Sequence, residues 1–192
     1  LLPLLGIAGT SVVVMAAASV RRGRLTASAL TIGGLALSFG LLFAARSVTP
    51  IQVTPLLLID GAALFFFGLI IAAAAVVAIL AHDYLARRGC HAEELSLLLL
   101  FATLGACVLA ASTHFASLFL GLEVLSVSLY AMLAYLRDDE SSLEAGVKYL
   151  VLAAVSSAFL LFGMALVYAH TGDLGFAALA GVEWSPVVLA GV

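Results

Sequence analysis

The chain contains very few charged residues. Only 10% of its 192 residues are charged, whereas soluble domains carry about 25%. Hydrophobic residues make up 65% of the sequence, and the mean hydropathy is +1.26. This composition excludes an ordinary soluble domain and predicts a polytopic membrane protein.

Cysteine and proline are also scarce. The two cysteines, Cys90 in a polar loop and Cys107 in an apolar run, are expected at different depths, so we expect no disulfide between them. The sequence has no CxxC pair, cysteine cluster or GxGxxG motif, and therefore lacks the signatures of a redox cofactor or dinucleotide site. None of the four prolines lies deep in an apolar run, so we expect no broken helix.

Six apolar runs are long enough to cross a bilayer, which requires about 20 residues. They predict an all-α transmembrane bundle with helices at 2–20, 25–45, 61–81, 93–111, 115–136 and 142–169. A seventh helix is predicted to begin at Pro186 with Ser185 as its cap, and Asp60 is predicted to cap the third helix. The segment from Thr49 to Ile59 is predicted to be extended and outside the bilayer.

We treat 1–192 as a single membrane domain. Its parts are helices one to four (1–111), helices five and six (115–169) and the start of helix seven (186–192). Because the sequence begins with Leu1 and its last apolar run stops at Val192, we expect it to be the front of a longer protein. The first run ends in arginines without a cleavage site, which predicts a true first helix.

The distribution of arginine predicts the orientation. Six arginines lie in odd-numbered loops, and Arg46 alone lies in an even-numbered loop. Because basic loops tend to remain in the cytoplasm, we expect cytoplasmic odd loops and a periplasmic N-terminus. The six are Arg21, Arg22, Arg24, Arg87, Arg88 and Arg137.

Glu123 is a carboxylate in the middle of the fifth predicted helix. It lies 13 residues before Leu136, which is about 20 Å along a helix. A charge at this depth costs at least roughly 2.5 kcal/mol to insert. Burial favours the protonated form and a nearby cation favours the ionised form, so a moving charge could switch Glu123 between them. The alternative is a static ion pair or protonated acid that holds helices together.

Lys148 is the only lysine and lies near the start of the sixth helix. Ser141 and Glu144 form a capping-box pattern, which would place Lys148 about 10 Å beyond the cap. Glu123 and Lys148 would then differ in depth by about 10 Å, so we predict a water-mediated link and no direct salt bridge. Alternatively, Lys148 pairs with Glu144 four residues earlier, or extends to the membrane surface.

Several other ionisable residues were considered as candidates. His114, with Thr113 as a possible cap, is either part of a proton path or a polar residue at a helix end. Five residues of the third loop resemble loose metal ligands, but their spacing matches no zinc pattern and we predict no metal site there. These five are His82, Asp83, Cys90, His91 and Glu93. The run 137–140, Asp173 and Glu183 are expected in solvated loops.

Three stretches of the second half carry a family resemblance. They are Ala116-Ser-Leu-Phe-Leu-Gly-Leu-Glu123, Ser142-Leu-Glu-Ala-Gly-Val-Lys148-Tyr149, and Ser156-Ser-Ala-Phe-Leu-Leu-Phe-Gly-Met-Ala-Leu-Val-Tyr168 with Thr171-Gly-Asp-Leu174. They closely resemble the subunit N family of bacterial NADH:quinone oxidoreductase, respiratory complex I, and the resemblance extends more weakly through the first four helices. It implies an antiporter-like subunit with a proton route along buried charged residues.

The resemblance also implies roles for particular residues. Glu123 matches the family's fifth-helix glutamate and Lys148 the lysine that follows on the sixth helix, with His114 and Glu144 as accessory candidates. The family's seventh-helix lysine and later lysines lie beyond Val192, so the resemblance implies that pumping also needs residues outside this sequence. The resemblance implies a multi-pass protein of the bacterial inner membrane, in contact with lipid and other membrane subunits. It implies no nucleic acid, metal or cofactor in this chain, with FMN, iron–sulfur clusters and quinone in other subunits.

Two alternatives to this function remain open. A subunit of a multisubunit cation/proton antiporter would share the glutamate, and a non-catalytic membrane scaffold would use it only for packing. The stretch from Leu143 to Tyr149 favours subunit N.

Overall fold

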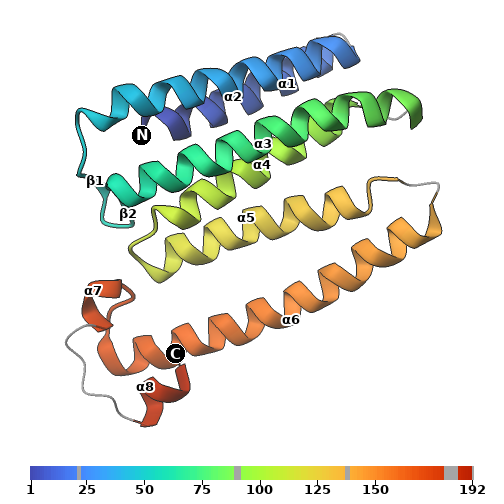
Figure 1. The fold of residues 1–192 in the computed structure, drawn as a ribbon. Helices are drawn as coiled ribbons and strands as arrows, with labels where there is room; N and C mark the ends of the chain where they lie inside the picture. The colour runs from blue at the N-terminus through green and yellow to red at the C-terminus, as the bar shows by residue number, and fades with distance from the viewer. Residues whose placement is uncertain (21–22, 89–91, 137–138, 180–185, 192) are drawn as a thin grey trace.

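A computed structural model describes residues 1–20, 23–88, 92–136, 139–179 and 186–191 (Figure 1). Within these ranges, six helices are long and apolar enough to cross a membrane, which confirms the predicted transmembrane bundle. They are α1 (Leu2–Val20), α2 (Arg24–Arg46), α3 (Gly61–Arg88), α4 (Ala92–Ala110), α5 (Phe115–Leu133) and α6 (Glu140–Thr171). Two short helices follow, α7 (Phe176–Leu179) and α8 (Pro186–Gly191).

The helix bounds differ from the predicted ones at several ends. The third helix continues past the predicted end at Ala81 as far as Arg88, so the polar residues after the apolar run are also helical. The fifth ends at Leu133, three residues early, and α7 was not predicted. The last helix begins at Pro186 as predicted, whereas its proposed cap, Ser185, lies outside the described residues.

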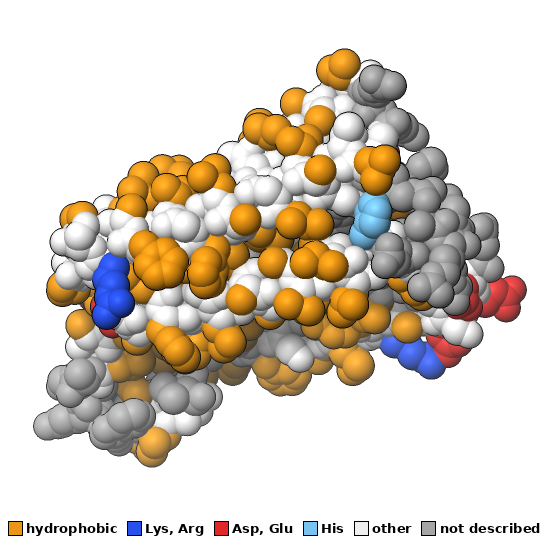
Figure 2. Space-filling view, turned by 45° about the horizontal axis from the view of Figure 1, so that its top comes forward, with side chains coloured by type: hydrophobic (Ala, Val, Ile, Leu, Met, Phe, Trp, Pro, Cys, Tyr) orange, Lys and Arg blue, Asp and Glu red, His pale blue; other side chains and the backbone are white. Residues whose placement is uncertain are grey.

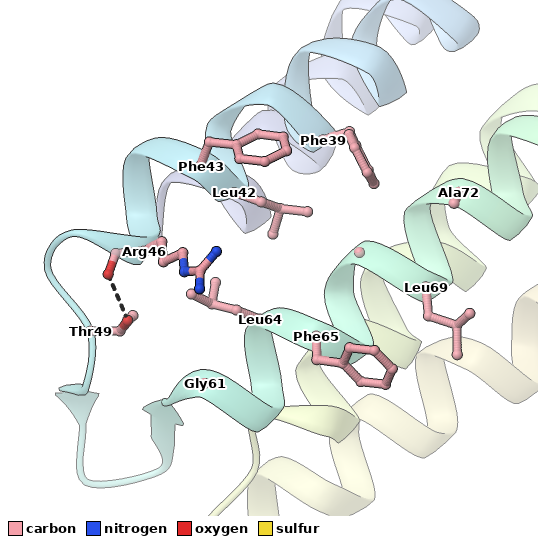
Figure 3. A pocket seen from close by; sticks show the side chains of 11 residues that line it. Phe39, Leu42, Phe43, Arg46, Thr49, Gly61, Leu64, Phe65, Leu69 and Ala72 are labelled. Carbon is pink, nitrogen blue, oxygen red and sulfur yellow. Dashed lines mark hydrogen bonds between the residues drawn. The ribbon is translucent and has the colours of Figure 1, made fainter.

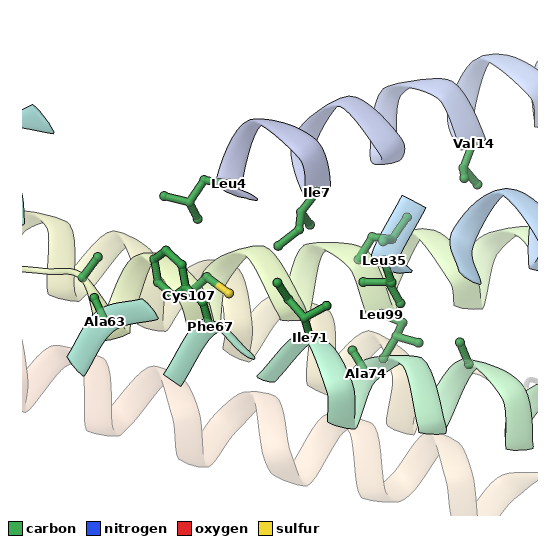
Figure 4. Close-up of a cluster of buried hydrophobic side chains, with 13 residues drawn as sticks. Leu4, Ile7, Val14, Leu35, Ala63, Phe67, Ile71, Ala74, Leu99 and Cys107 are labelled. Atoms are coloured by element: carbon green, nitrogen blue, oxygen red, sulfur yellow. The ribbon is translucent and has the colours of Figure 1, made fainter. Parts of the chain in front are cut away.

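The apolar core lies among the first four spans (Figure 4). Phe67 and Ile71 of α3 are fully buried between Ile7 of α1, Leu35 of α2 and Leu100 of α4. Cys107 of α4 belongs to the same cluster and has a free thiol. The residues of this cluster come from α1, α2, α3 and α4, with Ala111 directly after α4. These four spans therefore pack as one bundle.

Glycines bring α5 against this bundle. A Cβ atom on Gly105 of α4 would lie only 2.7 Å from the backbone nitrogen of Leu125 in α5. In the reverse direction, a Cβ atom on Gly121 of α5 would lie 2.9 Å from the backbone nitrogen of Leu109 in α4. Small residues allow membrane helices to approach this closely. The contact fixes the position of α5, the helix that carries Glu123.

A small hairpin lies at one end of the bundle and connects to α5. The predicted extended segment forms strands β1 (Ile51–Thr54) and β2 (Leu57–Ile59), which pair antiparallel. The Ser117 hydroxyl of α5 donates to the carbonyl of Leu56 at 2.7 Å. Asp60 caps α3 as predicted, with its carboxylate accepting from the Ala63 N–H at 2.7 Å.

The outside of the bundle is apolar. Large hydrophobic side chains are exposed along every spanning helix, and Figure 2 shows them spread over one face with charged side chains near its two ends. An apolar band between charged ends matches the hydrocarbon layer of a bilayer. The chain is therefore described as a multi-pass membrane protein.

Candidate proton-transfer site

Glu123 lies in the middle of α5, 10 residues before the end of the helix and so about 15 Å along it. Its side chain is half-buried. The hydroxyl of Ser157, on the neighbouring helix α6, donates a hydrogen bond to a carboxylate oxygen of Glu123. The predicted mid-span carboxylate is thus held between two membrane helices, with a hydroxyl as its partner.

A cavity of about 510 Å³ lies between α5 and α6 beside this hydrogen bond. Its polar lining consists of Ser126, Tyr149, Ser156 and Ser157. A water molecule occupies about 30 Å³ in the liquid and needs two to four polar partners, so this cavity has both the space and the groups for several. A water molecule bound to these groups would lie next to the Ser157–Glu123 hydrogen bond.

Lys148 is bonded to Glu144 rather than to Glu123. The ammonium donates to the Glu144 carboxylate four residues earlier on α6, and the two side chains are 69% and 64% exposed. This is the i, i+4 pair that the sequence left open as an alternative. Lys148 precedes Ser157 by nine residues, or about 13 Å of helix, so its backbone and Glu123 lie at different levels.

The cavity extends toward the level of Lys148. Tyr149, the residue after Lys148, lines one part of it, and Ser157, which bonds to Glu123, lines another. The water-mediated link between Glu123 and Lys148 stays a prediction, and this cavity is the space through which it would run.

The capping box predicted for the sixth helix is wrong. The cap is Asp139, whose carboxylate accepts from the Ser141 N–H at 3.0 Å, and the helix begins at Glu140. An aspartate placed directly before the first turn can bond the free amides there, which leaves Ser141 inside the helix. Lys148 therefore lies about 13 Å beyond the cap, deeper than the 10 Å expected.

His114 caps α5 itself, so the prediction of a Thr113 cap is wrong. Its Nδ1 accepts a hydrogen bond from the Ala116 N–H at 3.0 Å. A protonated imidazole has no acceptor nitrogen, so proton uptake at Nδ1 would break this cap. The geometry therefore favours the alternative of a polar residue at a helix end, and a role in the proton path stays a prediction.

The third-loop residues are arranged differently from the prediction. His82 lies within α3 and not in a loop, and its Nδ1 is 2.9 Å from the Ser28 hydroxyl of α2. Glu93 lies in the first turn of α4 and is buried. Cys90 and His91 are outside the described residues; among those described, no three acidic, histidine or cysteine residues gather as metal ligands.

The structure describes some of the acidic residues that were predicted to lie in solvated loops. Glu140 and Asp173 are exposed, and Asp139 is the exposed cap of α6. Arg137, Asp138 and Glu183 lie outside the described residues.

Ser157 is the site residue that the sequence analysis missed. The depth of the two residues could have indicated it. The predicted bounds place Glu123 about 20 Å and Ser157 about 22 Å from the loop that joins the fifth and sixth helices. Serine in a membrane helix often bonds to its own backbone, as Ser156 does to the Leu152 carbonyl at 2.9 Å. Only the packing of α6 on α5 shows which serine faces the carboxylate.

The chain was compared with known families and proteins. Residues 112–189 match a family model described as "NADH:quinone oxidoreductase/Mrp antiporter, TM". The chain is 46% identical over 184 residues to NADH-quinone oxidoreductase subunit N of Ectopseudomonas mendocina, covering 93% of this chain and 37% of that protein. It is 45% identical over 196 residues to subunit N of Methylococcus capsulatus, covering 100% of this chain and 40% of that protein.

Solved structures show the same fold. A chain of respiratory complex I from Thermus thermophilus with bound Aureothin superposes with a TM-score of 0.84 at 29% identity, over 98% of this chain and 41% of that one. A chain of the archaeal membrane-bound sulfane sulfur reductase superposes with a TM-score of 0.82 at 24% identity, over 99% and 42%, and shows the fold alone.

The chain spans about two fifths of the length of the curated relatives it matches. The resemblance predicted from its motifs is confirmed by these relatives, the family model and the complex I structure. Over the part that it spans, this chain is therefore similar in sequence to subunit N of NADH-quinone oxidoreductase and similar in fold to a chain of respiratory complex I.

Proposed function

We propose that this chain forms part of a proton-translocating membrane subunit of NADH:quinone oxidoreductase, in which Glu123 takes up and releases a proton. The main supporting observation is that Glu123 is a half-buried carboxylate in the middle of a spanning helix and is hydrogen-bonded to Ser157 of the next span. The relatives and the complex I structure support this assignment. The subunit would work in a bacterial inner membrane, with its N-terminus in the periplasm and other complex I membrane subunits as partners.

Glu123 can hold a proton in one state and a charge in the other. In the protonated state no charge is buried, so the insertion cost of roughly 2.5 kcal/mol or more is avoided. In the ionised state the Ser157 hydroxyl and water in the adjoining cavity can donate to the carboxylate. A cation that approached through this cavity would favour the ionised state and release the proton.

The redox chemistry would take place elsewhere in the complex. Quinone reduction in other subunits, which would hold FMN, iron–sulfur clusters and quinone, would drive the charge movement that Glu123 senses. In this proposal the chain supplies no redox group and acts on protons alone.

The test is Glu123→Gln in the full-length subunit within the assembled complex. Glutamine is nearly the same size and its carbonyl can still accept from Ser157, so helix packing should be retained. We expect the complex to assemble and NADH-driven proton pumping to be reduced, because the amide cannot release a proton. Pumping is measured in membrane vesicles together with NADH-driven quinone reduction.

Glu140→Gln is the matched control, because Glu140 is an exposed acid at the start of α6. It should leave pumping unchanged. Normal pumping by Glu123→Gln would overturn the proposal, and reduced assembly of Glu123→Gln would support the scaffold alternative instead.

Lys148 is proposed to have a secondary role. Its pairing with Glu144 and its exposure indicate that it can be replaced with less effect than Glu123. We expect Lys148→Ala to reduce pumping only partly, in the same vesicle measurement. A complete loss of coupling would make Lys148 the essential charge partner of Glu123.

A cation/proton antiporter subunit is the second candidate, because the description of the matching family model names the Mrp antiporter as well. It predicts sodium-dependent proton exchange in vesicles that lack NADH and quinone. Absence of that exchange, with pumping driven by NADH, supports the first proposal.

A further inference from the structure

A second cavity, of about 750 Å³, lies on the outer side of α2 and α3, two helices that do not carry Glu123 (Figure 3). Its walls are aromatic and aliphatic, with Phe39 and Phe43 contributed by α2 and Phe65 and Leu69 by α3. Its volume falls within the roughly 300–1,000 Å³ of typical small-molecule sites. We call this cavity the α2–α3 groove.

Glycine keeps the groove open. Gly68 lines it, and a Cβ atom there would lie 3.6 Å from the Leu42 side chain, which is an ordinary contact. Gly61, at the start of α3, has nothing within 4 Å of the corresponding position. A larger side chain would therefore fit at either position, and the missing side chains leave space that a bound molecule can fill.

One cation lies at the mouth of the groove. Arg46 is the last residue of α2, and its guanidinium extends toward Leu64 of α3 (Figure 3). Its side chain takes no part in an ion pair within the described ranges, whereas Lys148 is paired with Glu144. Asp60, the nearby cap of α3, has its carboxylate bonded to the Ala63 N–H and does not line the groove. The Arg46 guanidinium is thus available to an external anion.

The charged and apolar parts of the groove lie at different depths. Arg46 ends one spanning helix and Gly61 begins the next, so the mouth lies at the end of the spans. Phe43 is three residues and Phe39 seven residues further into the span, or about 5 Å and 10 Å. Phe43 and Phe65 are 70% and 68% exposed. A cation at the interface above exposed aromatic walls matches the order of headgroup and acyl chain in a lipid.

We propose that the α2–α3 groove binds an anionic phospholipid. The lipid phosphate pairs with the Arg46 guanidinium, which can donate two parallel hydrogen bonds to it. One acyl chain lies between the phenyl rings of Phe39 and Phe43 and the side chains of Phe65 and Leu69. An uncharged apolar occupant would leave the guanidinium to water alone, whereas a lipid phosphate pairs with it, so charge complementarity favours the anionic lipid.

The experiment uses the full-length subunit in its purified membrane complex, reconstituted with phosphatidylglycerol that carries a photoactivatable group in one acyl chain. After illumination, labelled peptides are identified by mass spectrometry. We expect labelling of peptides from α2 and α3. Arg46→Gln should reduce it about fivefold, the change that corresponds to one basic residue near a membrane surface, while Arg46→Lys should retain most of it.

Two further comparisons test the groove itself. Phe65 lines the groove and its neighbour Phe66 does not, so Phe65→Leu should weaken labelling and Phe66→Leu should leave it unchanged. A photoactivatable phosphatidylethanolamine, which carries no net charge, should label the groove less than phosphatidylglycerol.

Equal labelling by the two lipids, or unchanged labelling in Arg46→Gln, would overturn the proposal. Absence of lipid labelling would overturn it as well, and a photo-crosslinker at Phe43 that captures another protein subunit would then identify a protein as the occupant. The readout does not depend on pumping, so this proposal and the proposed function can fail separately.

Discussion

The bundle α1–α4 and the helix pair α5–α6 are packed in different ways. In the most apolar part of α4, 39% of the residues are buried among the described residues; in the corresponding part of α6, 11% are buried. The first four spans share an apolar core that includes the fully buried Phe67. The buried residues of α5 are Ser117, Gly121 and Ser128, all small.

This difference separates a scaffold from a site. A close-packed apolar core excludes water and resists movement of its helices. Between α5 and α6, by contrast, a cavity of about 510 Å³ lies beside the Glu123–Ser157 hydrogen bond. A carboxyl group that exchanges protons needs water and room for a changing charge, and the cavity between α5 and α6 has space for both.

The largest effect is expected from a matched pair of phenylalanines. Phe67→Ala should leave a cavity in the core of α1–α4, because Phe67 is 0% exposed. Lipid tails are as apolar as this core, so we expect a cost of about 2 kcal/mol, below the roughly 3–5 kcal/mol seen in soluble proteins. Phe159→Ala on α6 should cost almost nothing, because Phe159 is 73% exposed.

The measurement is thermal stability of the full-length subunit in its purified complex. A large cost for Phe159→Ala would break the comparison, since it would show that another helix covers α6 in the complete protein. Equal, small costs would mean that Phe67 contributes no more to stability than an exposed side chain.

A smaller effect is expected from the serine that contacts Glu123. Ser157→Ala removes one hydrogen bond to the carboxylate, worth on average about 0.6 kcal/mol and at most about 1.7 kcal/mol within membranes. NADH-driven proton pumping should fall to a level between those of the unaltered complex and Glu123→Gln.

Ser156→Ala is the control for this change. Ser156 lines the same cavity, but its hydroxyl donates to its own helix at the Leu152 carbonyl and does not contact Glu123, so pumping should fall less than in Ser157→Ala. Equal effects of the two substitutions would mean that α6 tolerates no loss of hydroxyls, and that the Ser157 contact has no special role.

The smallest effect is expected in the scaffold, at a buried threonine. The Thr31 hydroxyl is the one buried side-chain polar atom in the described ranges that lacks a hydrogen-bond partner. Thr31→Val removes an unsatisfied group and should be neutral, or stabilising by up to about 1 kcal/mol. Thr103→Val, which loses a 2.7 Å hydrogen bond to the Leu99 carbonyl, should be destabilising by about 0.5–1 kcal/mol.

Thermal stability of the assembled complex again gives the measurement. A loss in Thr31→Val as large as that in Thr103→Val would show that a water molecule satisfies Thr31. The small cavity lined by Thr31, Ser28, His82 and Ser96 would then be its binding site.

Helix ends were predicted less well than helices. The capping-box pattern at Ser141 and Glu144 is sound locally, but Asp139 stands earlier in the chain and its carboxylate bonds the free amides of the first turn. At the start of α5, His114 caps in place of Thr113 because its Nδ1 reaches the Ala116 amide. Several side chains can compete for the same amides, and sequence patterns do not rank them.

The sequence by itself determined the membrane class and the number of spans, and it singled out Glu123 as the candidate site residue. These follow from local quantities, since apolar runs of about 20 residues must form helices in lipid and an acid within such a run stands out without reference to other helices. The family motifs also lie in continuous stretches, and the similarity to the curated relatives bears out the resemblance that these motifs indicate.

Only the tertiary structure decided which groups meet. Glu123 and Ser157 are 34 residues apart, and Lys148 is held by Glu144 on the outer face of α6. Gly105 and Gly121 bring α4 and α5 together, and Gly146 of α6 lies against Ala134 at the end of α5; no local pattern encodes these contacts. Side-chain partners across helices depend on rotation and depth together, and both are set by how whole helices pack.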